Sequence, residues 1–296
     1  MSRTVQLLGA LATASLAFGA VTTQPASATA SAVCSVGVGA VTGSGESGSA
    51  VLATMPPTWS SGLFVNKPYP APVRLSSAIA SSKNGEGDYD VSGYVVLGDT
   101  LYNTYSIVHE DGEIMARALV RIGGGWSSYV ALHRSSYSAP GTLPRNTVYG
   151  LRRDGVLFRW NAANWGQKTS YPGFSAVKSM ALISATATYD TFLANTRGGA
   201  LYTIHIPVTS PMKPVVKLVR RSGWQGFEAM LAQKCGIYGT LVIGIDTDTH
   251  AGYLYAVGHA VGTSTVIEPR GKVPGSFGSA VYFRWITQPE PPPFGE

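Results

Sequence analysis

The sequence predicts an all-β protein folded as a five-bladed β-propeller of four-stranded blades. Three observations predict it. The composition suits strands and tight turns, with 35 Gly, 15 Tyr and 45% hydrophobic residues. Two short motifs recur along the chain at intervals of roughly 43 to 53 residues, which is the length of a propeller blade. The sequence also contains no amphipathic helical pattern of useful length.

The N-terminal residues 1–28 are interpreted as a signal peptide. Arg3 provides a positive charge, residues 5–21 form an apolar run without charge, and Ala26-Ser27-Ala28 provides the small residues of a cleavage site. A membrane anchor is the alternative interpretation, although about 17 residues is at the short limit for a span. We therefore expect a secreted protein without a membrane span, whose mature chain begins near residue 29.

The chain has two cysteines, Cys34 and Cys235. In the oxidising compartment that a signal peptide implies, an even number of cysteines predicts one disulfide bond. The alternative is a pair of buried, unbonded thiols. The disulfide would link the first and last repeats.

A first motif consists of a glycine, one spacer residue and two apolar or aromatic residues. Several copies follow an acidic residue, as in Asp154-Gly155, and this pair is typical of a hairpin turn. The copies are Gly62-Leu63-Phe64-Val65, Gly112-Glu113-Ile114-Met115, Gly155-Val156-Leu157-Phe158, Gly199-Ala200-Leu201-Tyr202 and Gly252-Tyr253-Leu254-Tyr255.

A second motif keeps step with the first and consists of a glycine, an aromatic residue and apolar positions three residues apart. Its copies begin at Gly125-Trp126, Gly173-Phe174, Gly223-Trp224 and, more weakly, Gly275-Ser276-Phe277. A blade cannot bury its faces alone, so the blades must stack in a ring. We expect Trp126, Phe174 and Trp224 to fill the gaps between neighbouring blades.

Short strands are predicted around these motifs, three or four in each repeat. The strand pairs are 148–151 with 156–160, 191–194 with 200–206, and 240–245 with 253–257. The strand 279–285 is expected to lie beside 35–41 and close the ring.

These assignments divide the chain into a signal peptide at 1–28, a single propeller domain at 29–286 and a Pro-rich C-terminal tail at 287–296. The segment 81–90 is rich in Ser, Gly and acidic residues and is predicted as a loop between the first two repeats.

The repeats resemble those of the tachylectin-2 type lectins. The residues that carry the resemblance are Gly223-Trp224-Gln225-Gly226-Phe227 and, further on, Gly252-Tyr253-Leu254-Tyr255-Ala256-Val257. The resemblance covers about four of five repeats and implies a five-bladed propeller that recognises N-acetylated sugars at shallow, repeated sites. The repeats here are longer, and the first lacks the aromatic motif. The sugar-contacting loops of the family have no residue-by-residue match, so site residues are inferred from residue type.

Charge and motif spacing argue against several classes of function. The net charge of +6 is spread over isolated pairs such as Arg152-Arg153 and Arg220-Arg221, and no nucleic-acid-binding motif accompanies it. A mildly basic surface suits acidic cell-wall polymers or anionic glycans, but a solvated surface that serves solubility is the interpretation that the charge alone favours. The five histidines lack metal-ligand spacing, and Asp246-Thr247-Asp248 lacks the other oxygens of a calcium loop. We expect no metal, no cofactor and no nucleic-acid partner.

A catalytic role finds little support. Gly45-Glu46-Ser47-Gly48 is not a nucleophile motif, because its glycine spacing differs and its surroundings are those of a loop. A glycosidase would need two carboxylates in the central cleft. Asp190 and Glu228 are the best candidates because they lie nearer strands than the other acidic residues. We name no catalytic residue.

A sugar-binding site needs an aromatic ring for the C–H face of the sugar and polar groups for its hydroxyls. Trp165 is preferred because it follows Asn161-Ala162-Ala163-Asn164 in a polar loop. The predicted ligand-binding residues are Trp165, Asn161, Asn164, Asp154 and Asn195. Aromatic residues of propellers also serve as packing between blades, which is the competing interpretation of each ring.

The sequence thus favours a secreted, monomeric, non-catalytic lectin-like propeller whose partners are glycans or cell-wall polymers. A protein-interaction propeller at the cell surface and a glycoside hydrolase with carboxylates in the central channel are the alternatives.

Overall fold

The computed structural model describes residues 34–166 and 168–296. The predicted signal peptide lies outside the described residues. The described part consists of β-strands and turns, and its one helical element is the short 3-10 helix η1 (Gly262–Ser264). No helix in this part is long and apolar enough to cross a membrane. The prediction of an all-β protein is confirmed.

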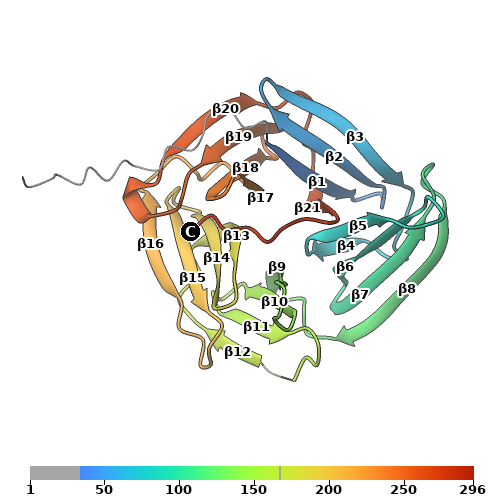
Figure 1. Ribbon diagram of the computed structural model, residues 1–296, viewed down its shortest axis with the longest axis horizontal. Coiled ribbons are helices and arrows are strands. Elements are labelled where there is room, and N and C mark those ends of the chain that lie inside the picture. The colour runs from blue at the N-terminus through green and yellow to red at the C-terminus, as the bar shows by residue number, and fades with distance from the viewer. Residues whose placement is uncertain (1–33, 167) are drawn as a thin grey trace, which may run out of the picture.

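Three separate sheets contain four antiparallel strands each, in chain order. The first is β9 (Tyr129–Tyr137), β10 (Arg145–Arg152), β11 (Leu157–Asn161) and β12 (Lys168–Tyr171). The second is β13 (Val177–Ala185), β14 (Tyr189–Thr196), β15 (Leu201–Pro207) and β16 (Val215–Arg220). The third is β17 (Ala229–Cys235), β18 (Gly239–Asp246), β19 (Ala251–Val257) and β20 (Ile267–Lys272). Figure 1 shows them around a common axis, with β9, β13 and β17 innermost.

The remaining strands form one nine-stranded sheet in the order β3-β2-β1-β21-β5-β6-β7-β8, with β4 beside β6. Its N-terminal strands are β1 (Ser35–Thr42), β2 (Ser47–Thr54) and β3 (Pro57–Val65). The next are β4 (Val73–Ser76), β5 (Ile79–Lys83), β6 (Tyr89–Leu97), β7 (Thr100–Val108) and β8 (Ile114–Gly123). The last is β21 (Ala280–Thr287).

A short parallel pairing joins the two halves of this large sheet. Trp285–Thr287 of β21 pairs with Ile79–Ser81 of β5. Dividing the sheet there leaves β21-β1-β2-β3 and β4/β5-β6-β7-β8, each comparable to the separate sheets. Five units then surround the axis, whereas the sheets joined by hydrogen bonds number four. The predicted count of five therefore depends on this division.

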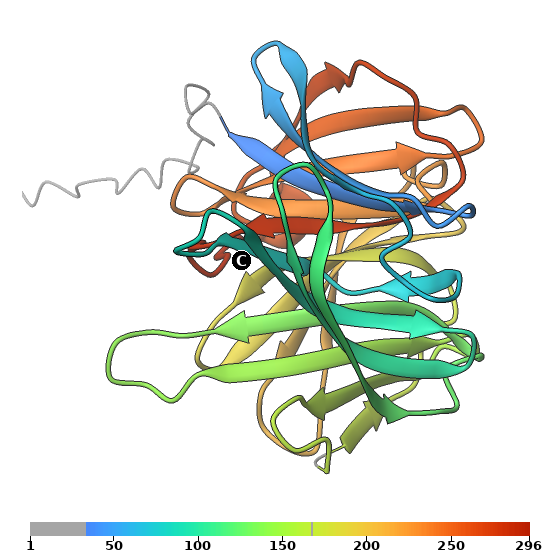
Figure 2. The same cartoon turned by 90° about the vertical axis from the view of Figure 1, so that its right-hand side faces the viewer.

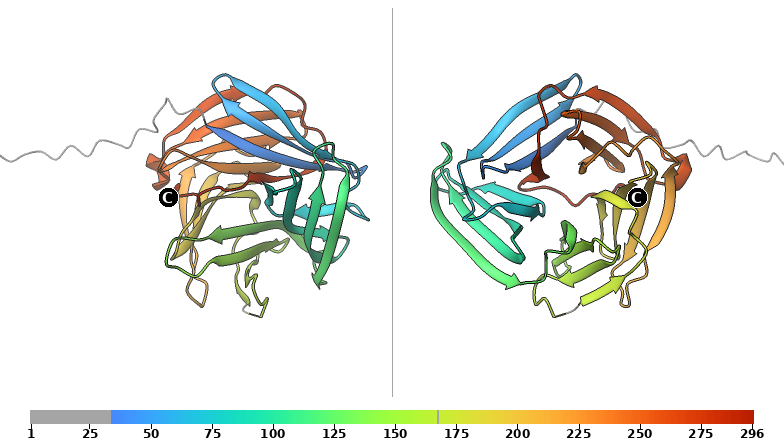
Figure 3. Two further views of the ribbon diagram at one scale, coloured as in Figure 1. Left: turned by 45° about the vertical axis from the view of Figure 1, so that its right-hand side comes forward. Right: turned by 180° about the vertical axis from the view of Figure 1, so that it is seen from behind.

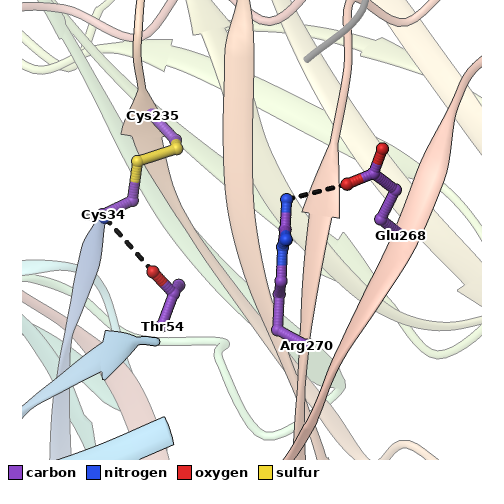
Figure 4. Close-up of a disulfide and its surroundings, with 5 residues drawn as sticks. All are labelled: Cys34, Thr54, Cys235, Glu268 and Arg270. Atoms are coloured by element: carbon purple, nitrogen blue, oxygen red, sulfur yellow. Dashed lines mark hydrogen bonds and ion pairs between the residues drawn. A yellow bond between two sulfur atoms is a disulfide. The ribbon is translucent and has the colours of Figure 1, made fainter. Parts of the chain in front are cut away.

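The chain ends close the ring as predicted. β21 pairs antiparallel with β1, from Val38 opposite Arg284 to Thr42 opposite Ala280. Beside this pairing, Cys34 and Cys235 form a disulfide whose Cα atoms are 5.5 Å apart (Figure 4). It joins the start of β1 to the end of β17, which confirms the predicted bond. A covalent link across about 200 residues stabilises by about 5 kcal/mol on the chain-entropy view.

The second motif forms the same turn at successive gaps between sheets. Its glycine has a φ of 86° at Gly125 and 97° at Gly223, a conformation that favours glycine. The N–H of the following aromatic residue donates to the carbonyl of a hairpin turn in the preceding sheet. Trp126, Phe174 and Trp224 are 5%, 7% and 6% exposed in three different core clusters. Their predicted role between blades is confirmed.

The first motif is less regular than predicted. Gly155 and Gly199 have positive φ in the β10–β11 and β14–β15 turns, in matching positions. Gly112 instead lies in the turn between β7 and β8, and Gly62 lies inside β3. These two copies are out of phase, because the motif describes any tight turn that precedes an apolar strand. The expected loop at 81–90 is also wrong in part, since β5 extends to Lys83 and β6 begins at Tyr89.

The C-terminal segment after β21 runs across the opening of the ring (Figure 3). Gln288 donates to the Ser81 carbonyl at 2.8 Å, and Gly295 donates to the Ile183 carbonyl at 2.9 Å. The segment therefore links β5, on one side of the ring, to β13 on another. Figure 2 places the C-terminus at the same end of the ring as the loop between β9 and β10.

Candidate functional site

The carboxylate of Asp190 is buried, and both of its oxygens form hydrogen bonds with neighbouring side chains. It forms an ion pair with Arg145 at 2.6 Å, and the hydroxyls of Tyr149 and Ser135 donate to it at 2.7 and 2.6 Å. These partners lie on β9 and β10, whereas Asp190 lies on β14. A buried carboxylate with this set of donors stabilises the contact between the two sheets.

Glu228, the other carboxylate considered for hydrolysis, lies beside the central channel. It forms an ion pair with Lys178 and accepts the Thr247 N–H at 2.9 Å. Burial alone would raise the pKa of Glu228, but these two donors outweigh it and the pKa is lowered. Glu228 lines the channel cavity, whereas Asp190 lines none of the cavities described below. The structure does not bring the two carboxylates together as a hydrolytic pair.

The polar residues predicted to bind a sugar lie at different places in the structure. Asn161 and Asn164 each accept the backbone N–H two residues further on, so both shape the loop that carries Trp165. Asp154 is exposed and forms an ion pair with Arg152 at 2.6 Å. Asn195 is completely buried.

The side chain of Asn195 joins two sheets. Its amide donates to the carbonyls of Trp224 and Phe227 at 2.7 and 2.9 Å, and its oxygen accepts the Ser179 N–H at 2.9 Å. These bonds use both amide hydrogens and anchor the turn that carries Trp224. The position of Asn195 is therefore that of a packing residue.

Trp165 lies in a pocket between β8 and the sheet β9–β12, which we call the aromatic pocket. The cavity measures ≈ 420 Å³. Its walls combine aromatic rings, two cations and a glycine-rich backbone. The lining residues that matter here are Trp126, Tyr129, Arg152, Trp160, Trp165 and Lys168, with Gly123–Gly125.

The rings of the aromatic pocket lie against one another. The ring centroid of Trp160 is 5.4 Å from that of Trp126 and 6.5 Å from that of Trp165. Trp165 also meets Tyr94 edge to face at 5.4 Å. Burial raises the pKa of Tyr129, so its phenol stays neutral and acts as a hydrogen-bonding group.

Two cations that line this pocket, Arg152 and Lys168, lie over the ring of Phe158. Lys168 Nζ is 4.6 Å from the ring centroid of Phe158, and the guanidinium of Arg152 is 5.2 Å from it. Asp154 balances the charge of Arg152, whereas Lys168 forms no ion pair within the described residues. The pocket can thus offer stacking surfaces, N–H donors and one unbalanced positive charge to a ligand.

A second, open cavity of ≈ 750 Å³ adjoins the aromatic pocket and shares Trp160 and Lys168 with it. Asn161 lines this second cavity. Of the five residues predicted for ligand binding, Trp165 and Asn161 therefore line adjoining cavities, and the other three line neither.

Sequence reasoning missed Trp160, Arg152 and Lys168 as site residues. The strand pairing matches Trp160 with Ile204 in β15 and with Tyr255 in β19. An aromatic residue therefore also occupies this position at the gap of Trp224, and the sequence carried no separate signal for Trp160. Lys168 had no signal either, because its position beside Trp160 depends on the pairing of β11 with β12.

The sheets and their closure define the protein as an all-β propeller. The sequence matches no protein-family model and no curated protein. Among solved structures, the chain is similar to the WD40 domain of SCAP from fission yeast. That likeness has 11% identity and a TM-score of 0.33 over 85% of this chain and 74% of that chain. The fold assignment rests on the sheet topology rather than on this likeness.

Proposed function

We propose that the protein is a secreted, non-catalytic carbohydrate-binding propeller and that the aromatic pocket is its sugar site. The observation that carries the proposal is the convergence of Trp126, Trp160, Trp165 and Tyr129 on one open cavity. Sugars present C–H faces that stack on aromatic rings and hydroxyls that bond to nearby donors. The cavity offers both kinds of contact.

The rings of the aromatic pocket are not all covered by packing. At the gap of Phe174 one buried aromatic residue is enough for the turn, and at the gap of Trp224 the neighbouring rings belong to a core cluster. Trp165 packs against the core cluster of Trp126 but is itself only partly buried. A large ring that is only partly covered at the mouth of a cavity is available to a ligand.

The backbone of Trp165 supports the same proposal. Its φ is 53°, in the left-handed region that a bulky side chain seldom adopts. Such a conformation costs about 1–3 kcal/mol and tends to occur at ligand sites, where function maintains it. The Asn161 and Asn164 turns hold the loop in this conformation.

The test is the substitution Trp165→Gly. Glycine adopts a positive φ without strain, so we expect the variant to fold with a free energy of unfolding within about 1 kcal/mol of the wild type. Loss of the ring should weaken binding of N-acetylglucosamine oligomers at least tenfold, measured by calorimetric titration. A residue that served only packing would show the reverse, with a large loss of stability and unchanged binding.

The matched control is Trp59→Gly, which removes a tryptophan of β3 that is 43% exposed and does not line the aromatic pocket. It should leave sugar binding unchanged. If a glycan array carrying neutral, N-acetylated and acidic sugars shows no binding by the wild type at high protein concentration, the proposal fails.

A specific observation favours the alternative of a protein-interaction propeller. Ile237, Tyr238 and Phe294 are 72%, 50% and 38% exposed, and the rings of Tyr238 and Phe294 lie 5.7 Å apart. They form an apolar patch where the C-terminal segment meets the loop after β17. Clustered exposed apolar side chains are typical of protein contacts. Capture of a defined protein partner, abolished by Ile237→Asp, would favour this alternative over the sugar site.

A further inference from the structure

The central channel contains two cavities that meet at a pair of arginines. A cavity of ≈ 140 Å³ is lined by all five groups of innermost strands, and one of ≈ 430 Å³ lies between those strands and the C-terminal segment. Arg134 of β9 and Arg284 of β21 line both. We call the place where the cavities meet the channel waist.

Polar atoms without a protein partner gather around the smaller cavity. Within the described residues, the buried Nε atoms of Arg134 and Arg284 have no hydrogen-bond partner, and neither does Ser179 Oγ. All three residues line this cavity. Leaving buried donors unpaired is costly, and the cost is greatest for charged groups. Their concentration at one place therefore points to a ligand that accepts hydrogen bonds.

The C-terminal segment supplies a carboxylate to the channel waist. Glu290 forms an ion pair with Arg284, and both side chains are 11% exposed. Burial raises the pKa of Glu290 and lowers that of Arg284, so the pair is held in a poorly solvated place. Arg134 forms no ion pair within the described residues. Asp90, the other carboxylate of the larger cavity, accepts the Tyr105 hydroxyl at 2.7 Å.

We propose that the channel waist binds the carboxylate group of a small acidic molecule, with Arg134 and Arg284 as its cationic contacts. Glu290 acts as the protein's own competing carboxylate. The planar guanidinium matches the two oxygens of a carboxylate, which makes arginine the suited partner for this group. The volume of the smaller cavity limits the ligand to a few non-hydrogen atoms near the waist. This site is separate from the proposed sugar site, so either can be wrong without the other.

The experiment uses malonate as the probe. Thermal unfolding of the protein is followed as sodium malonate replaces sodium chloride at constant ionic strength. The wild type should show a saturable rise in Tm, because a ligand that binds only the folded state stabilises it. Arg134→Gln should weaken malonate binding at least tenfold. Glu290→Gln should strengthen it at least tenfold, because the competing carboxylate is removed.

The matched control is Arg221→Gln, which makes the same charge change at an exposed position after β16. It should respond like the wild type. Calorimetric titration of malonate into the wild type and Glu290→Gln gives a second measurement that does not depend on the fate of the Arg134 variant. The proposal is overturned if malonate and chloride give the same Tm for the wild type and for Glu290→Gln. It is also overturned if Arg134→Gln and Arg221→Gln bind malonate equally well, or if inorganic phosphate binds as tightly as malonate.

Discussion

The turns that carry Trp126 and Trp224 have the same backbone conformation and lie at two different gaps of the ring. Each follows a glycine of positive φ, 86° at Gly125 and 97° at Gly223. Each tryptophan donates its N–H to a hairpin turn of the preceding sheet, at 3.0 and 3.1 Å respectively. Both rings are almost completely buried. The fold therefore uses them in the same way.

The surroundings of the two rings differ. Trp224 meets Phe227 at 5.5 Å and Tyr255 at 4.9 Å, and these rings belong to a continuous core cluster. Trp126 meets Trp160 at 5.4 Å, and beyond them Lys168 lies at an open cavity. The comparison teaches that several rings can pack around either turn, so the candidate for ligand binding is the gap where Trp160, Trp165 and Lys168 line an open cavity.

The largest effect is expected for Trp224, whose buried ring serves the packing between sheets. Trp224→Ala should lower the free energy of unfolding by about 3–5 kcal/mol, because it removes a large buried ring and leaves a cavity. The folded variant should bind N-acetylglucosamine oligomers as the wild type does. Urea unfolding and calorimetric titration measure the two quantities. Loss of sugar binding in folded Trp224→Ala would break the comparison, because both gaps would then contribute to the site.

At a third gap, between β9 and β14, the buried ring is that of a histidine, so its packing can be tested by changing the pH. The ring centroid of His133 is 5.4 Å from that of Phe192, and burial lowers the pKa of His133 to about 4. In the unfolded chain the imidazole of His133 becomes protonated below pH about 6.5, whereas in the folded chain it becomes protonated only below pH about 4. Stability should therefore fall by about 3 kcal/mol as the pH decreases through this range.

The substitution His133→Gln should remove this share of the pH dependence, measured as the free energy of unfolding between pH 7 and pH 4. The matched control is His250→Asn, at an exposed position with a φ of 54° that asparagine tolerates. It should retain the pH dependence of the wild type. If the free energy of unfolding changes with pH to the same extent in the two variants, His133 is not held neutral by its packing.

The sequence predicted the parts of the fold that depend on local chemistry. The turn at Gly125-Trp126 needs a positive φ and a ring to bury, and both requirements are visible in the residues. The pairing of β21 with β1 followed from the need of a ring to close. The disulfide followed from the even number of cysteines together with the expectation of a secreted chain.

The parts that sequence reasoning missed depend on pairing across the chain. Asn195 is polar and lies near a turn, yet its amide is consumed by the carbonyls of Trp224 and Phe227. Gly112 has the residue pattern of the repeat, but it lies one hairpin further along its unit. Arg284 and Glu290 meet because the C-terminal segment turns back across the channel. None of these contacts has a signature in local spacing.

The smallest expected effect concerns the cation of the aromatic pocket. Lys168 Nζ lies 4.6 Å from the ring centroid of Phe158 and 6.0 Å from that of Trp160, and no carboxylate of the described residues forms an ion pair with it. Lys168→Gln should change the free energy of unfolding by less than about 1 kcal/mol, because exposed cation–π contacts contribute little. It should weaken binding of sugars that carry a carboxylate about three- to tenfold and leave neutral sugars unaffected.

Lys213→Gln makes the same charge change at an exposed position beyond β15 and should alter neither class of ligand. Titrations with glucuronate-containing and N-acetylglucosamine oligomers, at low and at physiological salt, separate an effect of the Lys168 charge from an effect of stacking. A charge effect should fade as salt rises, because screening weakens exposed interactions, whereas a stacking effect should not. Equal losses for both ligand classes at both salt concentrations would assign Lys168 to the packing of Phe158, and the difference between the two gaps would then consist of Trp165 and the open cavity alone.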